Sequence, residues 1–141
     1  MPISQDKEMV RRYYEEIVGQ GLIDRVPEYI SPMYVEVHRG KRYEVGIAGA
    51  QEHIRGVRRT YPDLQLLVDR QIAEEDFVVT CLTARGTHAG EWLGIAPTGK
   101  RLEFTAVNVD RVLDGRIVEH GGAADLLGPL LDAGAVRIVG R

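Results

Sequence analysis

The chain has 141 residues, of which 44% are hydrophobic and 28% charged, with a net charge of -3. This composition predicts one globular domain over residues 1–141, and the lack of a basic block argues against nucleic acid and membranes as partners. A single cysteine, Cys81, excludes an intrachain disulfide. Together with an N-terminal segment that lacks the apolar core of a signal peptide, it predicts a cytoplasmic protein.

The N-terminal segment predicts a helix with one apolar face. From Val10 to Val18, apolar residues recur at i, i+3, i+4, i+7 and i+8, which is the spacing of an amphipathic helix. Two tyrosines, Tyr13 and Tyr14, belong to this face. We expect Tyr13 to pack in the core, whereas Tyr14 could direct its hydroxyl into a cavity, because a buried tyrosine hydroxyl needs a hydrogen-bond partner.

Two further helices are predicted before residue 62. A short one is expected over residues 25–30, and a longer one over residues 50–61, which Pro62 ends. His53 lies beside the apolar side of the longer helix. A lone histidine there is more often a packed, hydrogen-bonded residue, and substrate binding is the alternative.

One strand is predicted between these two helices, over residues 34–38, because polar and apolar residues alternate there. Its two valines are expected to face the core and Glu36 the solvent. The alternative is that Glu36 or His38 rims a pocket, and for His38 both interpretations stay open. Residues 40–49 are expected to form a loop.

The second half of the chain predicts long antiparallel strands. Residues 64–72 and 76–87 are expected to form one hairpin, and residues 102–112 begin another. Asp114-Gly115 joins that run to a return strand starting at Ile117, because Asp-Gly between two β-rich runs is the strongest short-range hairpin signal. This second hairpin carries three polar residues in apolar surroundings: Asn108, His120 and Asp125. It is expected to supply the floor of any pocket.

A loop is predicted over residues 88–99, between the two hairpins. It begins with His88 and contains Trp92, the only tryptophan. We expect Trp92 to lie over the pocket mouth, and packing between subunits is the alternative. After the last strand, residues 126–132 predict a short helix that Asp125 could cap.

Four segments resemble a known family: RRYYEEIV (11–18), TYPDLQL (60–66), RGTHAGEWLGIAPTGKR (85–101) and DGRIVEHGGAADLL (114–127). They are similar to the SnoaL-like polyketide cyclase branch of the nuclear-transport-factor-2-like (NTF2-like) superfamily. The resemblance implies an α+β NTF2-like cone, with three N-terminal helices packed on a curved, mostly antiparallel sheet. It also implies a deep apolar pocket and a homo-oligomer, either a dimer or a tetramer.

The resemblance further implies a cyclase or isomerase of secondary metabolism, in the lyase or isomerase class. Such enzymes close a polyketide ring by an intramolecular aldol step without metal or cofactor. Their acid/base aspartate follows Glu-His-Trp and maps onto Asp125, while Tyr14 and Asn108 match pocket residues. The tryptophan of that motif is Gly121 here, followed by Gly122. Either the pocket is enlarged, or the strand bulges and re-aims Asp125.

Removing a proton beside a carbonyl requires a base held near an apolar substrate, and burial raises the pKa of a carboxylate toward neutrality. Asp125 is the expected base, with His120 and His88 as alternatives. In a regular strand, only one of His120 and Gly121 can face the cavity. Asn108 or Tyr14 could donate a hydrogen bond to the developing enolate oxygen.

The expected ligand is a small apolar molecule, bound by Tyr14, His38, His53, His88 and Trp92. The four histidines show no metal-ligand spacing, so neither a metal nor a cofactor is expected. Two other functions stay open, since a fold alone does not select a function. One is a non-catalytic module that binds an apolar ligand in the same cone. The other is an oxygenase-like or epoxide-opening relative.

Overall fold

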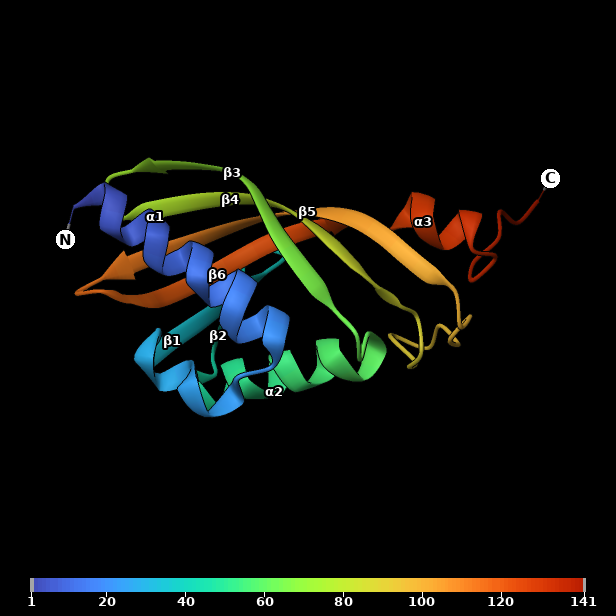
Figure 1. The fold of residues 1–141 in the computed structure, drawn as a ribbon, viewed down its shortest axis with the longest axis horizontal. Helices are drawn as coiled ribbons and strands as arrows, with labels where there is room; N and C mark the ends of the chain where they lie inside the picture. Colours follow the sequence, from blue (N-terminus) through green and yellow to red (C-terminus); the bar gives the residue numbers. More distant parts are fainter. Residues whose placement is uncertain (1, 141) are drawn as a thin grey trace.

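The computed structural model describes residues 2–140 as a curved sheet with helices packed against it (Figure 1). In chain order the elements are α1 (Ile3–Arg12), its π-helical continuation (Tyr13–Val18), a 3-10 helix (Ile23–Glu28), β1 (Ile30–His38), β2 (Lys41–Glu44), α2 (Gly46–Thr60), β3 (Gln65–Glu74), β4 (Phe77–Thr87), β5 (Arg101–Leu113), β6 (Arg116–Asp125) and α3 (Leu127–Asp132). Among the described residues, no helix is long and apolar enough to cross a membrane. The α+β class predicted from the sequence is confirmed.

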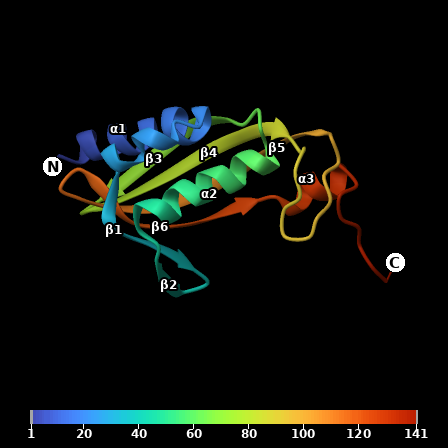
Figure 2. The same ribbon diagram turned by 90° about the horizontal axis from the view of Figure 1, so that it is seen from below.

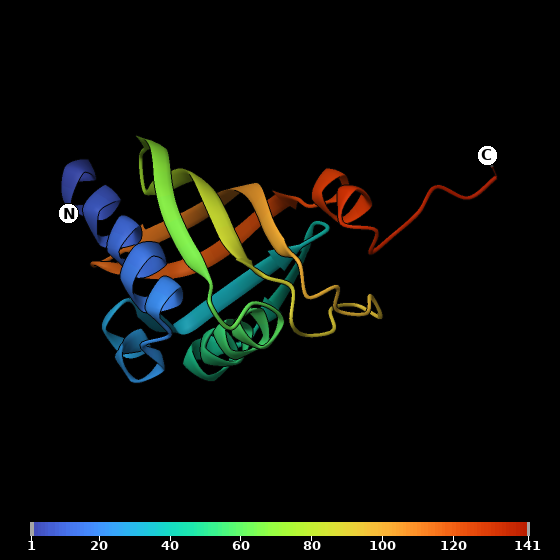
Figure 3. The same cartoon turned by 45° about the vertical axis from the view of Figure 1, so that its right-hand side comes forward.

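The sheet has six strands in the order β2-β1-β6-β5-β4-β3. All neighbouring pairs are antiparallel except β1 and β6, which run parallel. The four long strands β3 to β6 twist and curve around one side (Figure 3), as long antiparallel strands do. This curvature gives the sheet a concave face.

Helices α1 and α2 lie across one face of the sheet (Figure 2). The apolar stripe of the first helix is buried there, with Val10 and Ile17 fully inaccessible to solvent. Its last turn is π-helical, and this wider turn buries both Tyr13 and Tyr14. Turns of this kind recur at functional sites.

Two tight turns depend on left-handed residues, and the first of them is the turn predicted from the sequence. Asp114 and Gly115 have φ angles of 51° and 76°, which is the type I′ geometry expected for the β5–β6 hairpin. Arg39 and Gly40 have φ angles of 53° and 75° and join β1 to β2 in the same way. The prediction of a loop over residues 40–49 is therefore wrong: a short strand and the start of α2 lie there.

The two faces of β1 are the reverse of the prediction. Tyr34 is buried and lines the cavity, and Glu36 lies on that same face. Val37 instead lies beside Gly121 on the other face. The reason is tertiary: α2 packs on the Glu36 side of β1 and supplies a partner for its carboxylate.

Candidate active site

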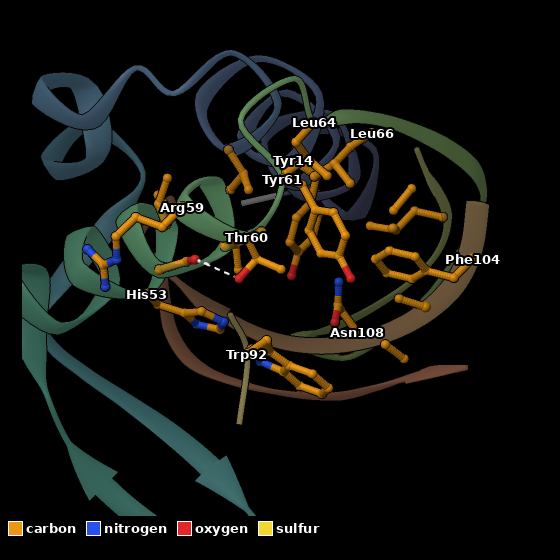
Figure 4. A pocket seen from close by; sticks show the side chains of 18 of the residues that line it. Tyr14, His53, Arg59, Thr60, Tyr61, Leu64, Leu66, Trp92, Phe104 and Asn108 are labelled. Carbon is orange, nitrogen blue, oxygen red and sulfur yellow. Dashed lines mark hydrogen bonds between the residues drawn. The ribbon is translucent and has the colours of Figure 1, made fainter. Parts of the chain in front are cut away.

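A cavity of about 510 Å³ lies between the concave face of the sheet and the helices. Its walls are mostly apolar and aromatic (Figure 4). Tyr61 and Phe104 form one wall, with ring centroids 5.6 Å apart. This volume suits a small organic molecule.

A buried polar cluster lies at this cavity. The Tyr14 hydroxyl donates a hydrogen bond of 2.5 Å to Oδ2 of Asp110. Nδ1 of His120 lies 2.7 Å from Oδ1 of Asp110 and 3.2 Å from the Tyr14 hydroxyl. Asp110 itself is completely buried. Each oxygen of the Asp110 carboxylate therefore has one side-chain partner. Asp110 and the Tyr14 hydroxyl together hold the His120 ring in place.

A bulge in β6 brings Asp110 and His120 together. Val112 pairs with Ile117, but Arg111 pairs with Glu119, so Val118 is an extra residue. Beyond this bulge, Asp110 lies opposite His120. Without it, a regular hairpin would place Glu119 opposite Asp110 and turn His120 to the other face.

The buried Asp110 carboxylate affects the protonation of both of its partners. Burial by itself lowers the pKa of His120, but the adjacent Asp110 carboxylate outweighs it, so the pKa lies above its usual value. Burial, and then Asp110, raise the pKa of Tyr14 well above its usual value, so the hydroxyl keeps its proton. With Nδ1 donating to Asp110, Nε2 of His120 is the free basic nitrogen, and it has no hydrogen-bond partner among residues 2–140.

A second histidine–carboxylate pair lies beside the first. Nδ1 of His53, on α2, is 2.7 Å from Oε2 of Glu36, on β1. Burial raises the pKa of Glu36, but the hydrogen bond with His53 and the nearby imidazoles outweigh it, so the pKa is lowered. The rings of His53 and His120 are 6.1 Å apart between centroids.

Glu36, His53 and His120 are also the residues that could hold a metal ion, since one ligand atom of each lies within 4.8 Å of the others. The spacing of the histidines along the sequence does not reveal this cluster. However, the Glu36 and His53 atoms are 2.7 Å apart, closer than the roughly 3.3 Å between neighbouring ligands of a tetrahedral zinc. Their geometry is that of a hydrogen-bonded pair.

The structure brings five of the predicted site residues to the cavity: Tyr14, His53, Trp92, Asn108 and His120. It places three others elsewhere. His38 is exposed at the end of β1. His88 is buried, and its Nδ1 lies 3.2 Å from the Thr98 hydroxyl, so it holds the loop that carries Trp92.

Asp125 is the third residue outside the cavity. It is exposed at the end of β6, and its neighbour Ala124 lines the cavity, so Asp125 lies on the outer face. It makes no capping bond to α3, which begins after Leu126. The position of Asp125 therefore supports neither of the roles expected of it, general base or helix cap.

The two glycines that replace the family tryptophan have different surroundings. A side chain at Gly121 would point away from the cavity toward Val37, so the missing tryptophan does not enlarge the pocket. At Gly122, a Cβ atom would lie 2.5 Å from the Val107 carbonyl oxygen and 2.4 Å from the Asn108 side-chain oxygen. Gly122 therefore makes room for Asn108, which presents its amide to the cavity (Figure 4).

Sequence reasoning missed Asp110, and for Glu36 it preferred a solvent-facing position to the rim of a pocket. A signal for Asp110 existed, because it lies two residues after Asn108 in a strand and so shares its face. For Glu36 the solvent-facing position was preferred because a charged residue in an alternating strand usually faces solvent. Its neighbours come from β6 and α2, which are far away in sequence.

Residues 8–132 match the family described as SnoaL-like polyketide cyclase. Nogalonic acid methyl ester cyclase of Streptomyces nogalater is 30% identical over 122 residues, which cover 81% of this chain and 87% of that protein. Aklanonic acid methyl ester cyclase AcmA of Streptomyces galilaeus is 28% identical over 130 residues, covering 89% and 88%. The crystal structure of AclR, described as a candidate hydroxylase of Streptomyces galilaeus, matches with a TM-score of 0.80 and 27% identity over 96% of this chain and 100% of that one. Since the family match spans most of the sequence and the fold agrees with it, this chain belongs to the SnoaL-like polyketide cyclase family.

Proposed function

We propose that this protein closes a ring in a polyketide-like substrate by an intramolecular aldol reaction, with His120 as the general base. The observation that carries this proposal is the 2.7 Å hydrogen bond between His120 and the fully buried Asp110 at an apolar cavity. Asp110 accepts the Nδ1–H bond, which leaves Nε2 unprotonated and able to take a proton. It also stabilises the imidazolium that forms, and this attraction is stronger in a poorly solvated site than in water.

The remaining chemistry needs only side chains at the same cavity. Nε2 of His120 removes a proton from a carbon beside a carbonyl, and the resulting enolate carbon attacks a second carbonyl of the same molecule. The Asn108 amide supports this step by donating a hydrogen bond to the enolate oxygen. Such a positioned base contributes roughly a hundredfold to ten-thousandfold in rate.

The charges around the cavity favour a neutral ester over a free acid. Glu91 lines the cavity, and two further carboxylates, Asp110 and Glu36, are hydrogen-bonded to the lining residues His120 and His53. Among the lining residues, the one arginine is Arg59, and its guanidinium pairs with Glu52 at 3.0 Å. A substrate carboxylate would therefore meet negative charge, with no unpaired arginine or lysine among the lining residues to bind it. We infer a substrate of the kind named for the two relatives, a methyl ester of a polyketide acid.

The experiment is incubation of the protein with nogalonic acid methyl ester and with the corresponding free acid, followed by chromatography and mass spectrometry. We expect the ester to be converted to a product of unchanged mass, because an aldol closure is an isomerisation, and the acid to react much more slowly. A product one oxygen atom heavier would indicate a hydroxylase instead. Binding of the ester without conversion would indicate a non-catalytic module.

We also propose that two copies associate through the outer face of the sheet. Ile72 on β3 and Val107 and Val109 on β5 are exposed on that face, opposite the cavity. Val79, on the intervening strand β4, pairs with both Ile72 and Val109. A contiguous apolar patch of this kind is typical of an interface.

Sedimentation is expected to show a dimer for the wild type and a monomer for Val107→Asp. Val139→Asp, in the exposed C-terminal segment, is the control and should stay dimeric, while a monomeric wild type would contradict the proposal.

A further inference from the structure

The Glu36–His53 pair has no part in the base chemistry described above, yet it borders the same cavity. His53 projects from α2 near Trp92 (Figure 4). Its Nδ1 is held by Glu36 at 2.7 Å, so its other nitrogen, Nε2, is free to contact a ligand. One nitrogen of His53 and one of His120 lie within 4.8 Å of each other.

Ring closure requires an acid as well as a base. When the enolate carbon attacks the second carbonyl, the electron pair of that C=O bond moves to its oxygen. An alkoxide left without a proton in an apolar cavity is costly. An acid must therefore lie close to the base. The carbon that loses its proton bonds directly to the carbon of the attacked carbonyl, so the carbonyl oxygen that gains a proton is only about two bonds away.

Five other polar groups at the cavity are less suited to give a proton. The Tyr14 hydroxyl is committed to Asp110, and the Thr60 hydroxyl to the Gly56 carbonyl oxygen. Burial raises the pKa of Tyr34 and of Tyr61, which makes both hydroxyls weaker acids. The Asn108 amide can donate a hydrogen bond but does not release a proton near neutral pH.

We propose that His53 is the general acid of the ring closure, and that Glu36 is the positioning residue that holds its ring. This inference rests on the proposed function. The C–H bond breaks and its proton goes to Nε2 of His120. The carbon–carbon bond forms and the C=O pair moves to oxygen. In this step His53 acts as an imidazolium, with its Nδ1–H donated to Glu36; the proton on its Nε2 passes to that oxygen, the N–H pair stays on the ring, and the ring becomes neutral.

The two histidines then return to their starting states without any co-reactant. The side chain of His53 is 51% exposed and that of His120 only 16%. His53 regains its proton from water, and His120 releases the one that it took. The substrate has been isomerised and no net proton has been consumed.

The test separates the two proton transfers in D2O, with nogalonic acid methyl ester as the probe. Cyclisation needs both groups, whereas incorporation of deuterium into the unreacted ester needs only the base. His53→Gln is expected to lower the cyclisation rate roughly a hundredfold or more, with deuterium incorporation at least as fast as in the wild type. Glu36→Gln should show the same separation to a smaller degree, and His120→Gln should lose both reactions.

His38→Gln is the matched control, because it removes an exposed histidine outside the cavity, and it should behave as the wild type does. Thermal melting of each variant shows that the fold is kept. The proposal is overturned if His53→Gln cyclises at the wild-type rate, or if it loses exchange and cyclisation together. It is also overturned if a chelator abolishes wild-type cyclisation and Zn²⁺ restores it, since the cluster would then hold a metal. A wild type that neither exchanges nor cyclises this ester would reject the proposed function itself, and this inference with it.

Discussion

Asp110→Asn is expected to lower the kcat of cyclisation by roughly a hundredfold to ten-thousandfold while the fold is kept. Asparagine has the shape of aspartate, so the buried position can accept it. Its amide, however, can donate to Nδ1 of His120, which favours the tautomer that carries the proton on Nε2. The ring would then present a donor to the substrate where the reaction needs a base. Steady-state kinetics with the methyl ester, together with thermal melting, measure this effect.

Asp125→Asn is the matched control, because it makes the same chemical change on the exposed outer face of β6. We expect close to wild-type activity and stability. Loss of activity in Asp125→Asn, combined with an active Asp110→Asn enzyme, would reject the Asp110–His120 pair and restore the aspartate that the family motif indicates.

The pH profile gives a second readout of the same substitution. His120 must be unprotonated to accept a proton, so activity rises as the pH passes upward through its pKa. Asp110 raises that pKa against the opposing effect of burial. Removing the carboxylate should therefore move the low-pH limb of the residual activity to lower pH.

Gly122→Ala is expected to reduce the free energy of unfolding by about 1–3 kcal/mol, the usual cost of overpacking. The new Cβ atom would lie 2.5 Å from the Val107 carbonyl oxygen and 3.0 Å from the Cα atom of Asn108. Both are backbone atoms of β5, so relief requires a shift of the strand rather than of one flexible side chain. The shift would also displace the Asn108 amide, and kcat should fall. Denaturant unfolding and kinetics measure the two effects.

The neighbouring Gly121→Ala is the comparison for this effect. There, the nearest atom to the new Cβ would be the Val37 carbonyl oxygen at 3.4 Å, an ordinary contact on the outer face. We expect a change in stability within about 0.5 kcal/mol and unchanged turnover. Equal stability of the two variants would show that β5 and β6 have room at Gly122 and that the proposed role of this glycine is wrong.

The amino-acid sequence by itself determined the features that depend on local patterns. The apolar period of the first helix, the β-rich runs and the Asp114-Gly115 turn predicted elements that the structure contains. The motif resemblance predicted the family, because it extends over nearly the whole chain. It also directed attention to Tyr14 and Asn108, while the polar residues of the β5–β6 hairpin directed attention to His120; all three line the cavity.

Only the tertiary structure decided which side chains meet. The side-chain period of a strand is two, so the single extra residue Val118 determines whether His120 or Gly121 faces the cavity, and nothing in the local pattern predicts it. Glu36 and His53 are paired because β1 lies parallel to β6 under α2, an arrangement of segments far apart in the chain. Asp125 follows the family motif in sequence, yet alternation along β6 places it on the outer face. The site therefore depends on register and packing, which act between distant segments.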